Sequence, residues 1–183
     1  VHVIQTSIRF PDGGHVPWAI RVNELTQNEH YQHLVAILAA KYAAIGHNVL
    51  VVSDRVQFLK TVAKLVGSNA VALTGENKDH DDRDKILLSV GKGTINVVCG
   101  TQAIFSEGIS HNPLSCLILG TPLNNEPLLE QLIGRVVREL EGKLQPVVVD
   151  IHLVGNTPQR QAMTRMGHYI NKGYVIRKEN WKS

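Results

Sequence analysis

The sequence predicts an α/β fold in which helices cover both faces of a mainly parallel β-sheet. Short apolar runs alternate with helical patterns along almost the whole chain of 183 residues, which is typical of successive βαβ units. Several runs, such as residues 49–52 and 147–149, are apolar on consecutive positions, as expected for strands buried on both faces. The predicted strands are residues 48–53, 70–74, 95–99, 116–119, 147–153 and 174–177.

Two helices between these strands have recognisable ends. Apolar residues recur at helical spacing from Tyr31 to Ile45, and Gly46 follows as a C-terminal stop. The segment 125–127, which contains a proline, is predicted to open a second helix, and Gly142 is predicted to close it.

The two ends of the chain carry weaker patterns. Thr157 and Pro158 resemble a capping residue and a first-turn proline, so a last helix is predicted to start there and to end near Gly173. Residues 1–28 are predicted to be an irregular or short-stranded lead-in from a missing N-terminal domain, and residues 29–183 to be the folded domain. The last helix carries an apolar stripe that is interpreted as core, which consists of Met163, Met166, Tyr169 and Ile170.

The composition indicates a single intracellular domain. Hydrophobic residues make up 43% and charged residues 19% of the chain, and no segment approaches the ~20 uninterrupted apolar residues that span a bilayer. The N-terminal residues show no secretion signal and no initiator methionine, which indicates a fragment of a longer chain. A net charge of +3 permits nucleic acid as a partner without demanding it. Cys99 and Cys116 lie in apolar runs without zinc-site spacing and are predicted to be buried, reduced thiols.

The segment from Gln131 to Arg138 is the most informative part of the chain. Gln131, Arg135 and Arg138 follow one another at i, i+4 and i+7, so they share one narrow helical face. Two neighbouring guanidinium groups suit a polyanion, and Gly134 leaves room for a phosphate or a second domain close to the backbone. An alternative remains open, in which the helix lies on the surface, Arg135 pairs with Glu139 and Arg138 is solvated.

Small and polar residues follow four of the predicted strands. Because the carboxyl ends of parallel strands meet at one edge, where ligands of such sheets gather, these segments are expected to form one rim. Backbone amides at turns and helix starts can bind phosphate there, although each turn taken singly is also consistent with ordinary loop chemistry. The segments are residues 53–55, 74–76, 100–102 and 120–121.

Four segments resemble conserved motifs of superfamily 2 helicases. Residues 131–138 resemble the last motif of that family, with Gln131 where many members carry histidine. The resemblance implies that residues 29–183 form the second RecA-like domain of such an enzyme, a three-layer sandwich. The other three segments are residues 49–55, which resemble the fourth motif, residues 100–110, which resemble the fifth, and residues 74–76 with Arg83, which are similar to the turn and helix that face nucleic acid.

The resemblance also implies how the chain takes part in ATP hydrolysis. Arg135 and Arg138 are implied to act as arginine fingers on the γ-phosphate, where they stabilise charge in the transition state. Ser110 stands where many family members carry an aspartate that reaches the ribose. The residues implied to contact ATP are Gln131, Gly108, Ser110 and Gly134.

Nucleic-acid contact is implied at the turns that follow the strands. Hydroxyl groups and backbone amides at such turns bind phosphates, which positions a strand without reading its bases. Residues 105–110 most resemble phage and viral recombination or repair helicases, and DNA is favoured over RNA as the partner. The residues implied to contact nucleic acid are Thr101, Gly75, Ser106, Arg55 and Arg83.

The chain lacks the sequence elements that hold ATP and magnesium. It contains no Gly-x-x-x-x-Gly-Lys-Ser/Thr sequence and no acidic pair at a strand end, and residues 91–94 are interpreted as a turn into a strand. The resemblance implies that a missing first domain supplies the ATP cradle and the Mg²⁺ ligands, so this chain alone is predicted to hydrolyse no ATP. The pair His30 and His33 and the acidic residues at 79–84 are not expected to bind a metal.

Two alternatives to a helicase motor domain are considered. The first is a catalytically inactive nucleic-acid- or protein-binding module with a RecA-like fold, which the intact Gln131, Arg135 and Arg138 disfavour. The second is a free-standing nucleotide-binding α/β domain. It is disfavoured because no glycine-rich fingerprint follows a predicted strand.

Overall fold

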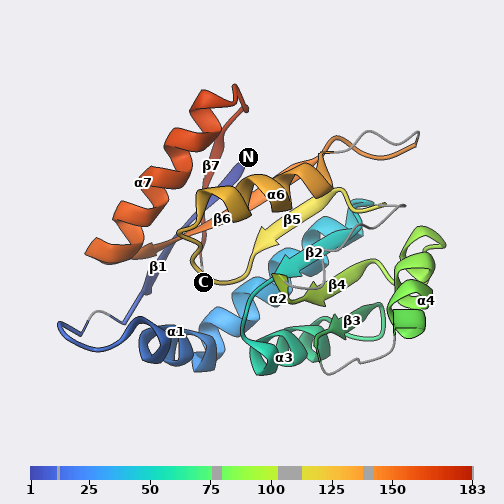
Figure 1. The fold of residues 1–183 in the computed structure, drawn as a ribbon, viewed down its shortest axis with the longest axis horizontal. Helices are drawn as coiled ribbons and strands as arrows, with labels where there is room; N and C mark the ends of the chain where they lie inside the picture. Colours follow the sequence, from blue (N-terminus) through green and yellow to red (C-terminus); the bar gives the residue numbers. More distant parts are fainter. Residues whose placement is uncertain (12, 76–79, 103–112, 138–141, 183) are drawn as a thin grey trace.

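In the computed structural model, residues 1–11, 13–75, 80–102, 113–137 and 142–182 are described, with the backbone alone for residues 80–83 and 91. Within these residues, seven parallel strands form one sheet in the order β3-β4-β2-β5-β6-β1-β7 (Figure 1). The strands are β1 (His2–Arg9), β2 (Val49–Val52), β3 (Ala70–Leu73), β4 (Val97–Gly100), β5 (Cys116–Leu119), β6 (Val147–Val154) and β7 (Arg177–Asn180). The helices are α1 (Trp18–Gln27), α2 (Glu29–Ala44), α3 (Val56–Val66), α4 (His80–Gly91), α6 (Glu126–Val136) and α7 (Asn156–Asn171).

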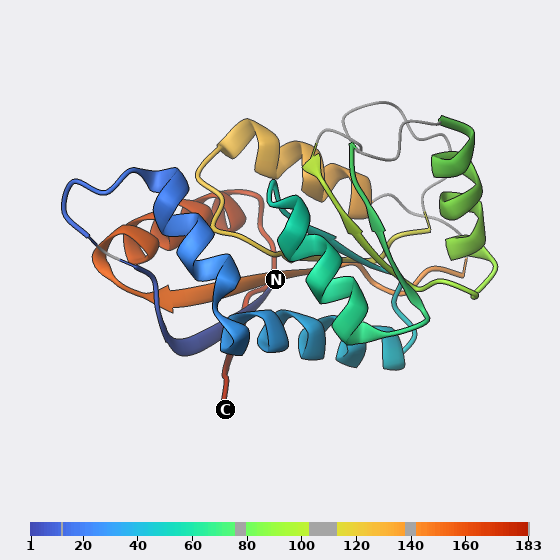
Figure 2. The ribbon, with the colours of Figure 1, turned by 90° about the horizontal axis from the view of Figure 1, so that it is seen from below.

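Helices cover both faces of the sheet, so the fold has three layers (Figure 2). Helices α1, α2 and α3 pack into one apolar core, and α4, α6 and α7 pack into the other. Successive strand residues point to opposite faces, so Val49 and Val51 join the first core while Leu50 and Val52 join the second. This double burial explains the consecutive apolar residues and confirms the predicted fold class. None of the described helices is both long and apolar enough to cross a membrane.

Five of the six predicted strands lie within two residues of their predicted bounds, and the sixth is displaced. The prediction of a strand at residues 174–177 is wrong, because β7 begins only at Arg177 and runs to Asn180. Tyr174 and Ile176 supplied the apolar signal, but they pack against the second core before the strand starts. The strand itself is an exposed edge of charged and polar residues, a composition that gives no strand signal in the sequence.

Residues 1–28 do not form the irregular or short-stranded lead-in that the sequence predicted. β1 is an eight-residue strand that lies between β6 and β7, and its Val3 and Ile4 are fully buried. Helix α1 contributes Val22 and Leu25 to the first core. Polar residues in the second half of β1 obscure its strand pattern in the sequence. These residues therefore belong to the same sheet and core as the rest of the described chain.

The helix that carries the arginine motif starts as predicted and ends earlier. The Asn125 side chain caps α6 by accepting a 3.0 Å hydrogen bond from the amide of Leu128. The described helix ends at Val136, so the prediction that it continues to Gly142 is wrong. The Lys143 ammonium group donates a 2.7 Å hydrogen bond to the Val136 carbonyl, which satisfies an acceptor that the helix end leaves free.

The apolar stripe of the last helix is split between two faces. Helix α7 begins at Asn156, one residue before the predicted start, and Tyr169 is fully buried in it. Met163 and Ile170 are instead 75% and 65% exposed. Residues seven apart lie on one helical face, so these two side chains point together toward solvent, while Arg165 occupies the inward face. The interpretation of the whole stripe as core is therefore wrong.

Candidate nucleic-acid and nucleotide sites

Polar turns follow four neighbouring strands at one edge of the sheet. The register pairs Val52 with both Gly100 and Leu119, and it pairs Leu73 with Gly100, so strands β2 to β5 end at one level. The segments predicted to form a rim are thus brought together at this carboxyl edge. The first residues beyond the strands are Ser53, Thr74, Thr101 and Gly120.

Two buried hydroxyl groups connect the turns that follow β2 and β5 at the carboxyl edge. The Ser53 and Thr121 hydroxyl oxygens lie 3.2 Å apart in a hydrogen bond, and the Ser53 oxygen also accepts a 3.1 Å bond from the amide of Arg55. Neither hydroxyl residue is exposed, since Ser53 and Thr121 are both buried. The outer parts of the turns are formed by Arg55, Gly75 and Thr101, which are at least partly accessible. Among the residues whose side chains are described, these three predicted nucleic-acid residues are accessible to a ligand.

The start of helix α3 has the features of an anion site. Arg55 is the residue before the first helical turn, and among the described residues no side chain caps this end. Its Nε lies 3.5 Å from an oxygen of Asp54 and makes no hydrogen bond within the described part of the chain. Free amides at a helix start carry partial positive charge, and a neighbouring guanidinium group adds to it. Phosphate is the biological anion that such a position suits best.

Gly120 marks the place where the turn after β5 passes closest to a neighbouring strand. Its amide donates a 2.8 Å hydrogen bond to the Val52 carbonyl, and a Cβ atom on Gly120 would lie 2.8 Å from the same oxygen. The Gly120 carbonyl accepts a 2.6 Å hydrogen bond from the Tyr31 hydroxyl, whose pKa is raised by complete burial. Only glycine fits this position without moving the strand.

Helix α6 connects the carboxyl edge of the sheet to the opposite edge. It follows β5 and precedes β6 in a parallel sheet, so it must run antiparallel to the strands. Its 11 residues cover a length of ~16 Å at 1.5 Å per residue. Helix α6 therefore ends toward the amino edge of the sheet (Figure 1). Arg135, half-buried in its last turn, lies at that end, whereas Thr101 directly follows β4 at the carboxyl edge. Arg135 is thus separated from Arg55, Gly75 and Thr101 by about the length of the strands.

The structure gives part of the predicted nucleotide site. Gln131 and Gly134 are exposed on α6, and a Cβ atom on Gly134 would meet nothing within 4 Å, so this face is open. Arg83 lies on α4 at a position where the backbone alone is described. The helical face that Gln131 and Arg135 were predicted to share with a second arginine stays a prediction, because that arginine is outside the described residues. Four predicted site residues lie outside them: Ser106, Gly108, Ser110 and Arg138.

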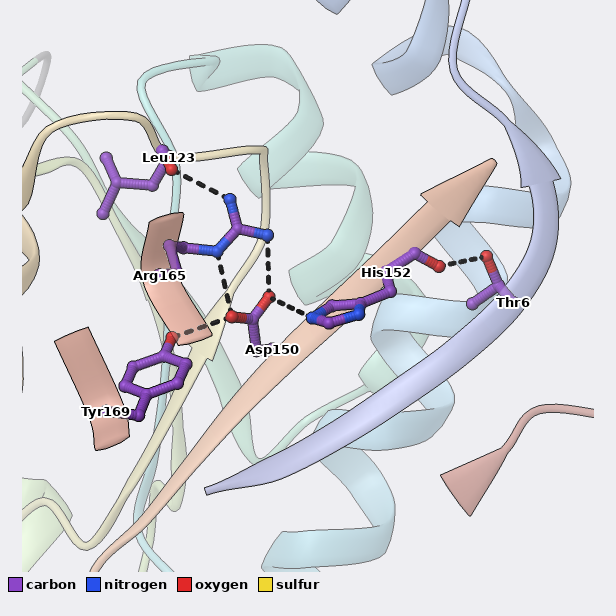
Figure 3. Close-up of polar contacts among 6 residues, drawn as sticks. All are labelled: Thr6, Leu123, Asp150, His152, Arg165 and Tyr169. Atoms are coloured by element: carbon purple, nitrogen blue, oxygen red, sulfur yellow. Dashed lines mark hydrogen bonds and ion pairs between the residues drawn. The ribbon is translucent and has the colours of Figure 1, made fainter. Parts of the chain in front are cut away.

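A buried polar cluster joins β6 to α7 and has no counterpart in the sequence predictions (Figure 3). Two nitrogens of the Arg165 guanidinium donate to the two Asp150 oxygens, each at 2.9 Å, and a third donates to the Leu123 carbonyl at 2.9 Å. The Tyr169 hydroxyl donates a 2.8 Å hydrogen bond to Asp150, and His152 Nε2 lies 3.7 Å from the same carboxylate. An aspartate inside an apolar strand is the signal that could have indicated such a cluster, because a buried charge requires a partner.

The Asp150 carboxylate sets the protonation of its neighbours. Burial lowers the pKa of Arg165, but the charge and hydrogen bonds of Asp150, together with Tyr169 and Tyr31, raise the pKa overall. Burial and the carboxylate together raise the pKa of Tyr169, whereas burial lowers the pKa of His152 more than the carboxylate raises it. At neutral pH the Arg165 guanidinium is therefore charged, the Tyr169 phenol is a protonated donor and the His152 imidazole is neutral.

The cysteines and histidines form no further reactive centre among the described residues. Cys99 and Cys116 are buried and unpaired, as predicted, and burial raises the pKa of the Cys99 thiol to about 12. In the described part of the chain, no three His, Cys, Asp or Glu side chains gather as metal ligands. His33 Nδ1 instead lies 2.7 Å from the Glu29 carbonyl of its own helix.

Solved structures with a similar fold define the class of domain. The crystal structure of T4 UvsW matches with a TM-score of 0.75 at 19% identity, covering 97% of this chain and 41% of that one. The C-terminal domain of the DEAD-box protein Dbp5 matches with a TM-score of 0.63 at 14% identity, covering 98% of this chain and 90% of that one. The fold is therefore a RecA-like domain of the kind found in helicases.

Residues 29–139 match the helicase conserved C-terminal domain, and the chain belongs to that family. It is 43% identical over 177 residues to probable helicase D10 of Escherichia phage T5, covering 95% of this chain and 39% of the relative. It is 26% identical over 147 residues to the ATP-dependent DNA helicase uvsW of Enterobacteria phage T4, covering 78% of this chain and 29% of the relative. The chain thus spans less than half the length of these relatives. The resemblance to superfamily 2 helicases is confirmed.

Proposed function

We propose that the chain is the second motor domain of an ATP-dependent helicase or translocase that acts on DNA. Membership of the helicase C-terminal family supports the class of enzyme. The relative that is named an ATP-dependent DNA helicase supports ATP as the hydrolysed nucleotide and DNA as the nucleic acid on which the enzyme acts. The phage origin of the relatives supports a viral protein that works in recombination or repair inside an infected cell or a bacterium.

In this proposal the carboxyl edge of the sheet grips the nucleic-acid backbone. Arg55, Gly75 and Thr101 lie at adjacent strand ends, and the uncapped start of α3 offers free amides beside Arg55. Amides, hydroxyl groups and a guanidinium bind phosphates irrespective of base sequence. Ser106 and Arg83 belong to the same proposed surface.

At the amino edge of the sheet, arginine side chains supply positive charge to the nucleotide in this proposal. Arg135 lies in the last turn of α6, and we assign it, together with Arg138, to the γ-phosphate of an ATP molecule bound in the cleft between two domains. A guanidinium placed where negative charge spreads in the transition state accelerates phosphoryl transfer by roughly a thousandfold or more. Gln131, Gly134, Gly108 and Ser110 complete the proposed contacts with ATP.

The rest of the nucleotide site is assigned to a first RecA-like domain. We assign the Mg²⁺ ligands to that domain together with the phosphate cradle, because the chain contains neither the cradle sequence nor an acidic pair at a strand end. Hydrolysis then requires both domains to close around ATP. The present chain alone hydrolyses no ATP in this scheme.

The proposal is supported by one observation, which is that helix α6 runs from the carboxyl edge, where Arg55, Gly75 and Thr101 lie, to Arg135 in its last turn. Helix α6 starts beside the turn after β5 at the nucleic-acid edge and ends with Arg135 near the nucleotide edge. Closure of the cleft at one end can therefore alter the grip on the strand at the other. Such mechanical coupling is what a translocating motor needs.

The proposal is tested by Arg135→Ala in the full-length protein. DNA-stimulated ATP hydrolysis is expected to fall by roughly a thousandfold, as for the loss of an arginine finger, while the thermal midpoint stays unchanged. The control is Arg160→Ala, which removes an exposed arginine of α7 and leaves hydrolysis unchanged. Wild-type turnover by the Arg135 variant contradicts the assignment and favours a surface helix with a weak ion pair of ~0.5 kcal/mol. A loss of activity that follows a loss of fold also contradicts the assignment.

A further inference from the structure

Helices α6 and α7 are joined by three polar contacts with matching spacing. Arg165, His168 and Lys172 lie three and four residues apart on α7, and their partners lie three and four residues apart along the chain into α6. The repeat of one spacing on both sides shows that the two helices run side by side in the same direction. The three contacts are Arg165 with the Leu123 carbonyl (2.9 Å), His168 Nδ1 with Glu126 (3.2 Å) and Lys172 with Glu130 (2.7 Å).

The three contacts differ in burial, and therefore in strength. The hydrogen bond from Arg165 to the Leu123 carbonyl is buried, and the Arg165 side chain is only 6% exposed. His168 is buried, but its partner Glu126 is mostly exposed. Lys172 and Glu130 are both largely exposed, and such pairs contribute little to stability because water screens them. The strongest hold of α7 on α6 is therefore at Arg165.

The buried contact is built so that only arginine can make it. The planar guanidinium uses two nitrogens for Asp150 and the third for the Leu123 carbonyl, a geometry that a lysine ammonium group cannot reproduce. The Tyr169 hydroxyl holds the same carboxylate from the other side. Leu123 lies two residues before the Asn125 cap, so this contact holds the segment from which α6 starts.

The start of α6 is held while its far end carries the arginine assigned to ATP. A small rotation of a helix about its first turn moves its last turn the most, over a length of ~16 Å here. Catalysis depends steeply on placement, so that a 1 Å displacement can cost about a hundredfold in rate. A small change at the Leu123 contact can therefore displace Arg135, even though this contact lies far from the proposed ATP position.

We propose that Arg165 is a positioning residue, which sets the angle of α6 and thereby places Gln131 and Arg135 for ATP hydrolysis. This inference rests on the proposed role of Arg135 at the γ-phosphate. Arg165 touches neither nucleotide nor nucleic acid; it acts through the Leu123 carbonyl and the helix that follows.

The test is Arg165→Lys in the full-length protein, with Lys172→Met on the exposed contact as the matched control. Lysine keeps a cation beside Asp150 but cannot also reach Leu123. We expect kcat for ATP hydrolysis with single-stranded DNA to fall roughly tenfold to a hundredfold, while the KM for DNA changes less than about twofold. Lys172→Met is expected to keep both values within about twofold of wild type.

Amide hydrogen exchange of residues 126–136 supplies a second measurement that does not need activity. Faster exchange of α6 is expected in the Arg165→Lys protein and not in the Lys172→Met protein. If Arg165→Lys fails to fold, Glu126→Ala removes the middle contact at an exposed position, and it should lower kcat more than Glu130→Ala does.

The outcomes separate the inference from the proposed function. A wild-type protein that shows no DNA-stimulated hydrolysis contradicts the proposed function, while the exchange measurement still tests the hold on α6. An active wild type in which Arg165→Lys lowers the thermal midpoint but keeps kcat, KM and α6 exchange contradicts the positioning role.

Discussion

The Tyr31 hydroxyl donates a 2.6 Å hydrogen bond to the Gly120 carbonyl, which links the first turn of α2 to the turn after β5 across 89 residues of sequence. Both groups are buried, so neither has access to water as a substitute partner. Tyr31 also stacks on Phe58 of α3, with ring centroids 5.8 Å apart. One side chain thus ties two helices of one face to the turn that leads into α6 on the other.

Replacing Tyr31 by phenylalanine is expected to destabilise the domain by ~1–3 kcal/mol, because it leaves a buried carbonyl without its donor. Chemical denaturation measures the change. The matched control is Tyr174→Phe, which removes a half-buried hydroxyl for which no hydrogen bond is seen within the described residues, and it should cost less than about 0.5 kcal/mol. Equal stabilities of the two variants would show that the Gly120 carbonyl gains nothing from Tyr31.

Glycine-to-alanine substitutions at two positions are expected to have opposite signs. Gly120→Ala places a Cβ atom 2.8 Å from the Val52 carbonyl and should destabilise by ~1–3 kcal/mol through forced displacement of the turn. Gly167→Ala lies within α7, where the new Cβ atom meets nothing within 4 Å, and should stabilise by ~0.5–1 kcal/mol through helix propensity. A thermal midpoint of the Gly120→Ala variant at or above that of the wild type would contradict the close approach at Gly120.

Binding of the chain to single-stranded DNA is expected to weaken steeply with salt, since phosphate contacts release counterions. Arg55→Gln should weaken binding of all sequences alike and reduce the magnitude of the slope of log K against log salt by about 0.7. Arg160→Gln, on the exposed surface of α7, serves as the control and should leave the slope unchanged. Fluorescence anisotropy over a salt series measures both. A sequence-selective affinity that is insensitive to salt would point to base contacts instead.

Stability is expected to fall as the solution becomes acidic, and His47 contributes to this loss. Burial lowers the pKa of His47 in the folded state, where its Nδ1 lies 2.8 Å from the Ser115 hydroxyl. The unfolded chain then binds more protons, so the stability is fully present above the ordinary pKa of ~6.5 and is lost as pH falls through the folded pKa. Burial lowers the pKa values of His2 and His152 as well, so they act in the same direction.

The measurement is the thermal midpoint between about pH 7.5 and about pH 5.5. His47→Gln should flatten the decline, because it removes one group that takes up a proton on unfolding. His30→Gln alters an exposed side chain on α2 and serves as the control. A midpoint that rises on acidification would contradict the assigned direction.

The central strands could be predicted because strands that are buried on both faces consist of consecutive apolar residues, which are easily recognised in the sequence. Residues 49–52 and 116–119 are buried throughout, and both were found at or within one residue of their predicted bounds. The strands β1 and β7 could not be predicted, since each contains polar or charged residues and is set by its pairing with a distant segment. Whether such a segment forms a strand depends on its neighbours in the folded sheet, and these neighbours cannot be inferred from a single sequence.

The part of the candidate site that lies at the ends of the strands could be predicted, because the order of parallel strands and helices fixes its position. Parallel strands must end at one edge, so Arg55, Gly75 and Thr101 could be brought together from their positions after strands alone. The cluster of Asp150 and Arg165 could not, because a charged residue on a helix is normally assigned to the solvent face. Only its buried partner reveals that Arg165 points inward.

The placement of β1 determines when the fold can be completed during synthesis. Its hydrogen-bonding partners are β6 and β7, so His2 can pair only after Val149 and Arg177 have been synthesised. Strands β2 to β5 pair among themselves and can assemble first, while the earliest strand stays unpaired on the emerging chain. Contacts of such long sequence separation slow folding, because loop closure must precede the gain from pairing. The sheet can therefore take in β1 only after β6 and β7 have been synthesised.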